Sequence, residues 1–99
     1  MELGGKSPLI WDKSTSFEHA AYKLACFKFQ NAGQTCITCD YMFIEESTLD
    51  RALKAIFKHI KKQYGIDKDN KSTWKRTELV GKIINETQLL RLQDMIETS

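Results

Sequence analysis

The 99-residue sequence has one proline, a small charge imbalance and no long hydrophobic run. One proline with five glycines excludes collagen-like and low-complexity classes. The longest uninterrupted hydrophobic runs, 24–27 and 41–44, are four residues each, whereas a membrane-spanning helix needs about 20. Fifteen Lys and Arg against 13 Asp and Glu leave a net charge of +2. This surplus is too weak to indicate nucleic acid or an anionic membrane as a partner.

Cysteine is also scarce. Three cysteines, Cys26, Cys36 and Cys39, cannot all pair within one chain. The chain does not open with basic residues followed by an apolar stretch, which is the pattern of a secretory signal. We therefore expect an intracellular protein, most simply a cytoplasmic one.

The order of apolar, capping and turn residues predicts an α/β fold, with short strands alternating with about three helices. Ninety-nine residues correspond to one small domain. Thr15 with Glu18, and Ser47 with Asp50, have the spacing of helix-capping pairs. The expected strands are 9–11 and 39–44, with a short strand or turn at 81–85. The expected helices are 17–29, a second one ending at Gly65, and 86–98, with a loop at 66–78.

Apolar residues surround the first expected helix on almost every side, so we expect it to be buried on most sides. Such burial is demanding in a chain of this length and suggests that further protein surrounds it. The second helix is amphipathic. We interpret its basic residues as a solvated face rather than a nucleic-acid or lipid patch; they are Arg51, Lys54, Lys58, Lys61 and Lys62.

Two short motifs are weak indications of chemistry. Gly4-Gly5-Lys6-Ser7 resembles the end of a phosphate-binding loop but lacks the required earlier glycine and preceding strand. Cys36-Ile-Thr-Cys39 could be a redox dithiol or half of a zinc site. Only Cys26, His19 and His59 remain as further soft ligands, so the sequence does not favour a metal site.

A stronger indication combines Cys36, in a connection after Gly33, with Glu2. A cysteine that presents its own backbone N–H can act as a nucleophile and share in an oxyanion hole. The segments Glu2-Leu-Gly-Gly-Lys-Ser-Pro8 and Asn31-Ala-Gly-Gln-Thr-Cys36 resemble the two signature segments of the aldehyde dehydrogenase family. Their separation, 36 − 2 = 34 residues, also fits that family.

The resemblance covers essentially the whole chain and extends to the class-3 or fatty-aldehyde branch. Further segments that carry it are Asp40-Tyr41, Gln63-Tyr64-Gly65 and Gly81-Lys-Ile-Ile-Asn85. That branch typically has proline where this chain has Cys39 and arginine where it has Lys82. Cys39 is thus peculiar to this sequence.

The resemblance implies NAD- or NADP-dependent oxidation of fatty or aromatic aldehydes to carboxylic acids. Cys36 would form a thiohemiacetal and then a thioester, and Glu2 would activate the water that hydrolyses it. The backbone of Leu3 would lie near the nicotinamide. No metal is implied, and the full-length protein would be a homodimer.

Residues 1–99 would be the N-terminal portion of the catalytic domain, with the cofactor domain absent, so we expect the chain to be inactive alone. The alternative is a non-enzymatic truncated remnant that acts in protein interaction or as a Cys36/Cys39 thiol switch.

Overall fold

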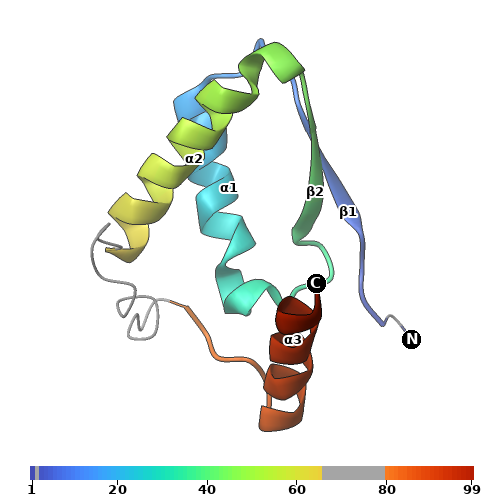
Figure 1. Cartoon of the computed structure of the whole chain (residues 1–99). Helices are drawn as coiled ribbons and strands as arrows, with labels where there is room; N and C mark the ends of the chain where they lie inside the picture. The colour runs from blue at the N-terminus through green and yellow to red at the C-terminus, as the bar shows by residue number, and fades with distance from the viewer. Residues whose placement is uncertain (2, 66–79) are drawn as a thin grey trace.

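The computed structural model describes residues 1, 3–65 and 80–99 and shows a mixed α/β arrangement (Figure 1). The elements follow in the order β1 (Ser7–Trp11), α1 (Phe17–Lys28), β2 (Cys39–Ile44), α2 (Leu49–Tyr64) and α3 (Glu86–Thr98). Short 3-10 turns span Gln30–Gly33 and Glu46–Thr48. The predicted fold class and three helices are confirmed. The predicted loop at 66–78 lies outside the described residues, and 81–85 forms no strand.

The two strands form a parallel pair, as a strand–helix–strand order requires when a helix makes the connection. Leu9 pairs with Met42, and Trp11 with Ile44. Because side chains alternate along a strand, these four lie on one face, where they belong to or pack against the core. The opposite face carries Pro8, Ile10, Tyr41 and Phe43, and it is largely exposed.

The core lies between α1, α2 and the inner face of the sheet. Ala21, Ala52 and Ala55 are buried, and their small side chains let the two helices approach closely. The rings of Trp11 and Phe17 lie 5.5 Å apart. These contacts fix α1 over the strands, with α2 packed on its far side (Figure 1).

The expectation that α1 is buried on most sides is not met within the described chain. Only Phe17, Ala21 and Ala25 of this helix are buried, whereas Phe27 is 63% exposed. Ala20 and Leu24 are partly buried against the core, whereas Tyr22 is 50% exposed.

Two predicted helix caps are wrong. The N-cap of α1 is Ser16, whose hydroxyl accepts from the His19 N–H, because Thr15 belongs to the preceding turn and donates its N–H to the Asp12 carbonyl. The N-cap of α2 is Thr48 rather than Ser47. The Ser47 hydroxyl instead donates to the Glu45 carboxylate at 2.7 Å.

The predicted end of α2 is confirmed. Gly65 has a left-handed φ of 62° and donates its N–H to the Lys61 carbonyl, the usual helix-ending geometry. None of the described helices combines the length and apolarity needed to cross a membrane.

Candidate active site

A strained loop leads from α1 to Cys36. Asn31, Ala32 and Gly33 adopt consecutive left-handed φ values of 52°, 56° and 76°. Alanine rarely takes this conformation because its Cβ crowds the backbone. Reciprocal bonds hold the turn: Asn31 Nδ2 donates to the Gln34 carbonyl at 3.1 Å, and Gln34 Nε2 donates to the Asn31 carbonyl at 2.9 Å. The chain therefore leaves α1 in a fixed direction toward Cys36.

Gln34 also fixes the loop to a distant segment. Its Nε2 donates to the Lys82 carbonyl at 3.0 Å, and its Oε1 accepts from the Ile84 N–H at 2.9 Å. One amide side chain thus holds residues about 50 positions away in the sequence against the loop. Sequence reasoning missed this role, although Gln34 stands inside the motif that ends at Cys36.

Cys36 is an exposed free cysteine at the start of a turn closed by a bond from the Thr38 N–H to the Thr35 carbonyl. The Thr38 hydroxyl also donates to the Phe27 carbonyl at 3.3 Å, which anchors the turn to the end of α1. Cys36 is therefore exposed on a turn that is held by the bond between Thr38 and Thr35 and by the bond between Thr38 and Phe27.

The segment before β1 meets this turn. A methyl group added to Gly5 would overlap the carbonyl oxygen of Cys36, so only glycine fits against that backbone. Two residues later, the Ser7 hydroxyl donates to the same carbonyl at 3.3 Å. The two signature segments therefore converge at Cys36.

The two other predicted site residues are Glu2 and Leu3. Glu2 lies outside the described residues, but it stands three positions before the Gly5 contact. Leu3 is 91% exposed. The structure brings Gly5 and Ser7 of the same segment to the Cys36 carbonyl.

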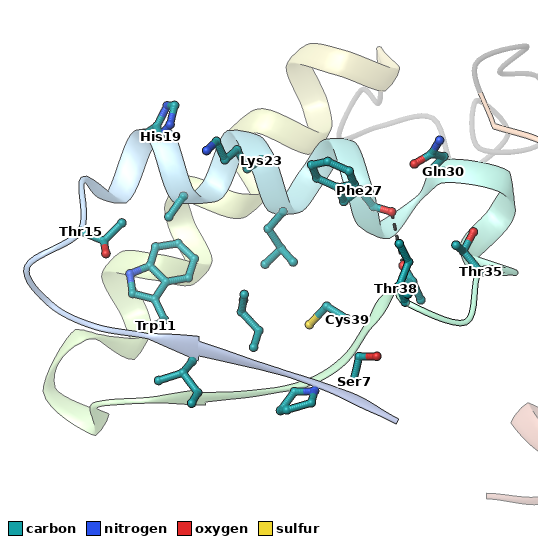
Figure 2. Close-up of a pocket in the computed structure, with 16 residues that line it drawn as sticks. Ser7, Trp11, Thr15, His19, Lys23, Phe27, Gln30, Thr35, Thr38 and Cys39 are labelled. Atoms are coloured by element: carbon teal, nitrogen blue, oxygen red, sulfur yellow. Dashed lines mark hydrogen bonds between the residues drawn. The ribbon is translucent and has the colours of Figure 1, made fainter. Parts of the chain in front are cut away.

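Cys39 lies in a different environment from Cys36. It is half-buried, and Figure 2 shows its sulfur pointing into the space between α1 and the strands. Its carbonyl accepts from Lys28 Nζ at 2.6 Å. Cys26 lies elsewhere and accepts from Gln63 Nε2 at 3.2 Å.

Other candidate sites receive no support from the geometry. Among the described residues, no three His, Cys, Asp or Glu side chains gather where they could hold a metal ion. The Gly4–Ser7 segment leads into strand β1, whereas a phosphate-binding loop leads into a helix.

A charge cluster joins helices α1 and α2. His59 Nε2 lies 2.8 Å from Glu18 Oε2, and Lys58 Nζ lies 3.1 Å from Glu18 Oε1. The hydrogen bond from Lys58, followed by that from His59, holds the pKa of Glu18 below its ordinary value. His59 is thus engaged in a contact between helices.

Comparison with known proteins gives one family. The family model described as the aldehyde dehydrogenase family matches residues 1–99. The chain is 34% identical to "Aldehyde dehydrogenase, dimeric NADP-preferring" of Rattus norvegicus, over 98% of the chain and 20% of the relative. It is 31% identical to "4,4'-diaponeurosporen-aldehyde dehydrogenase" of Staphylococcus aureus, over 100% and 20%. With "Aldehyde dehydrogenase family 3 member B1" of Homo sapiens it shares 33% identity, over 97% and 19%. The chain therefore spans about one fifth of the length of these relatives.

Proposed function

The chain belongs to the aldehyde dehydrogenase family and is class-3-like, and from this premise we propose that Cys36 is the nucleophile and Glu2 the general base of aldehyde oxidation. The contact of Gly5 with the Cys36 carbonyl carries the proposal. It supports a site in which the carboxylate of Glu2, three residues from Gly5, reaches the space in front of the Cys36 thiol.

In the proposed reaction, the Cys36 thiolate attacks the aldehyde carbonyl carbon and forms a C–S bond. The resulting oxyanion accepts a hydrogen bond from the Cys36 backbone N–H, which stabilises the developing charge. Loss of hydride from the thiohemiacetal carbon leaves a thioester on Cys36. Glu2 then takes a proton from water as the water attacks the thioester, and the carboxylic acid and the Cys36 thiol are released.

NAD or NADP, bound to the full-length protein, would supply the hydride acceptor. The described residues fit only a small part of such a cofactor: the backbone of Leu3, an exposed residue, would contact its nicotinamide. The five glycines do not form the spaced glycine motif that holds a dinucleotide pyrophosphate. We therefore propose that the remaining contacts come from protein outside these 99 residues, and that the chain alone does not oxidise aldehydes.

The relatives support finer proposals on substrate and assembly. The Staphylococcus relative is named as a 4,4'-diaponeurosporen-aldehyde dehydrogenase, which supports an aldehyde as the substrate; that this aldehyde is fatty or aromatic is part of our proposal. The rat relative is named as dimeric and NADP-preferring, which supports a homodimer for the full-length protein. A cytoplasmic location remains part of the same proposal.

The deacylation step can be tested in the chain itself. An activated acyl donor should acylate Cys36, and intact-mass measurement would then follow the loss of the acyl group with time. General-base catalysis contributes about 10²–10⁴-fold, so Glu2→Gln should slow deacylation at least roughly tenfold. Glu86→Gln is the matched control. Equal rates in the wild type and in Glu2→Gln would contradict the role of Glu2.

A second candidate function is a thiol switch. Ser7 pairs with Cys39 in the sheet register and contacts the Cys36 carbonyl through its hydroxyl, so both cysteines adjoin one residue. Oxidation of Cys36 by a peroxide to the sulfenic acid, followed by attack of the Cys39 thiol with loss of water, would close a disulfide. Mass spectrometry after mild peroxide treatment tests this candidate, and a sulfenic acid on Cys36 without a bridge would exclude it.

A further inference from the structure

The outward side of α2 carries charge of one sign. Positions 51–64 contain five Lys and Arg and no Asp or Glu. These basic residues form what we term the α2 basic face, and all except Lys61 are exposed; they are Arg51, Lys54, Lys58, Lys61 and Lys62. The other side of α2 packs on α1, which lies between α2 and the strands (Figure 1). The basic face is therefore turned away from the core.

The charges on this face are poorly compensated. Lys58 stands four positions from both Lys54 and Lys62, a spacing at which side chains on a helix are neighbours and like charges repel. Lys58 forms an ion pair with Glu18 at 3.1 Å, whereas Lys54 and Lys62 have no ion pair among the described residues. Solvated helix faces commonly alternate in charge sign. The solvated face expected from the sequence therefore does not account for this arrangement.

An exposed aromatic side chain stands among these lysines. Phe57 is 60% exposed, and helical spacing places it beside Lys54, three positions earlier, and Lys61, four positions later. Leu53, one turn before Phe57, is 37% exposed and extends the apolar surface. Apolar side chains gain free energy when they leave water. Lysines around exposed Phe and Leu side chains are the combination with which helices bind at a lipid interface.

We infer that the α2 basic face, with Phe57 and Leu53, binds an anionic phospholipid surface. The lysines attract the negatively charged headgroups, and the two apolar side chains enter the region between the headgroups. Leu53 favours lipid over a nucleic acid, since bases need flat stacking partners. The inference concerns association of the chain with a surface. It goes beyond the proposed function and holds even if Cys36 is not the nucleophile.

The test is sedimentation of the 99-residue chain with two kinds of vesicle, one of phosphatidylcholine alone and one of equal parts phosphatidylserine and phosphatidylcholine. The chain should bind the phosphatidylserine vesicles, and the binding should weaken as salt is added. Equal binding to both vesicles would overturn the inference, because apolar surface anywhere on the chain would then suffice. Binding to heparin or polyglutamate without binding to either vesicle would also overturn it.

Matched charge variants locate the surface. The double variant Lys54→Gln/Lys62→Gln should bind phosphatidylserine vesicles roughly 30-fold more weakly, at about fivefold for each charge removed. The control is Lys23→Gln/Lys82→Gln, which has the same net charge and alters exposed residues outside α2. It should stay within roughly twofold of the wild type. Equal losses in both double variants would show that net charge alone governs binding, and would contradict a site on α2.

An aromatic pair tests the apolar part of the surface. Phe57 and Phe27 are similarly exposed, at 60% and 63%, but Phe27 belongs to α1. Phe57→Ser should lower vesicle binding roughly tenfold, whereas Phe27→Ser should leave it unchanged, and equal effects would contradict the inference.

Thermal unfolding without vesicles separates loss of binding from loss of fold. Lys54→Gln/Lys62→Gln should unfold at the same temperature as the wild type or a higher one, because it relieves like-charge repulsion. A lower unfolding temperature would contradict the repulsion on which the inference rests. None of these measurements involves the Cys36 chemistry, so a failure of the proposed function remains distinguishable.

Discussion

Gly5 lies directly against the carbonyl group of Cys36, although the two residues are 31 positions apart. No side chain other than hydrogen fits there without displacement of the Cys36 backbone. The Ser7 hydroxyl reinforces the same contact. These two contacts thus set the position of the Cys36 turn relative to residues 5–7.

Gly5→Ala should displace the Cys36 turn and destabilise the chain by about 1–3 kcal/mol, the usual cost of forcing extra atoms into a packed site. Gly81→Ala is the control, since an added methyl group there makes only ordinary contacts of 3.5 Å or more. Urea unfolding of both variants measures the difference. A Gly5→Ala variant as stable as Gly81→Ala would show that the contact does not hold in solution.

Gln34→Ala should loosen residues 82–84 from the loop before Cys36, because one side chain makes the bonds to the Lys82 carbonyl and the Ile84 N–H. These bonds are exposed, so we expect a loss of about 0.5–1.5 kcal/mol for each. The direct readout is faster hydrogen exchange at the Ile84 amide. Gln63→Ala, which removes one bond to Cys26, should leave that amide unchanged.

The Glu18 cluster should make the packing of α1 on α2 depend on pH. The pKa of Glu18 is lowered in the fold by Lys58 first and His59 second. A lowered carboxyl pKa stabilises the fold above the ordinary value of 4.5, and this contribution is lost as pH falls through the folded value. Because the group is exposed, the effect is small and should weaken with salt.

The measurement is the free energy of unfolding of the wild type and of Glu18→Gln between pH 3 and pH 7. We expect the variant to be less stable at pH 7 and the difference to shrink as the pH falls below 4.5. Glu97→Gln is the control, as Glu97 has no ion pair within the described residues. A constant difference between wild type and Glu18→Gln across this range would exclude ionisation of Glu18 as the cause.

Local chemistry was sufficient to predict much of the fold. The spacing of apolar residues predicted α2 and α3, and Gly65 predicted the end of α2, since these features depend on neighbours within one or two turns. The cap at Ser47 was wrong because its hydroxyl bonds to Glu45, a choice that depends on the geometry of the preceding turn. The bonds of Gln34 to residues 82–84 were not predictable, because local sequence does not reveal pairings about 50 residues apart.

The site was predictable only in part. Its two segments were identified through a resemblance, and their convergence at Gly5 and Cys36 supports that reading. The bare surface of α1 was anticipated from its apolar residues on every side. The sequence suggested that further protein surrounds this helix, and Phe27 is left 63% exposed by the described residues.

Cys36 should be the fastest of the three cysteines to react with iodoacetamide, because it alone is exposed while Cys26 and Cys39 are half-buried. Cys39 faces a cavity beneath α1 (Figure 2), so its modification requires reagent to enter that space. Peptide mapping after brief alkylation at one pH gives the order directly. In Cys36→Ser the remaining two thiols should react slowly and at their original rates, because neither depends on Cys36 for its burial. Fast labelling of Cys39 before Cys36 would instead mean that the cavity is more open than the Cys36 turn, and would reverse the assignment of Cys36 as the accessible thiol.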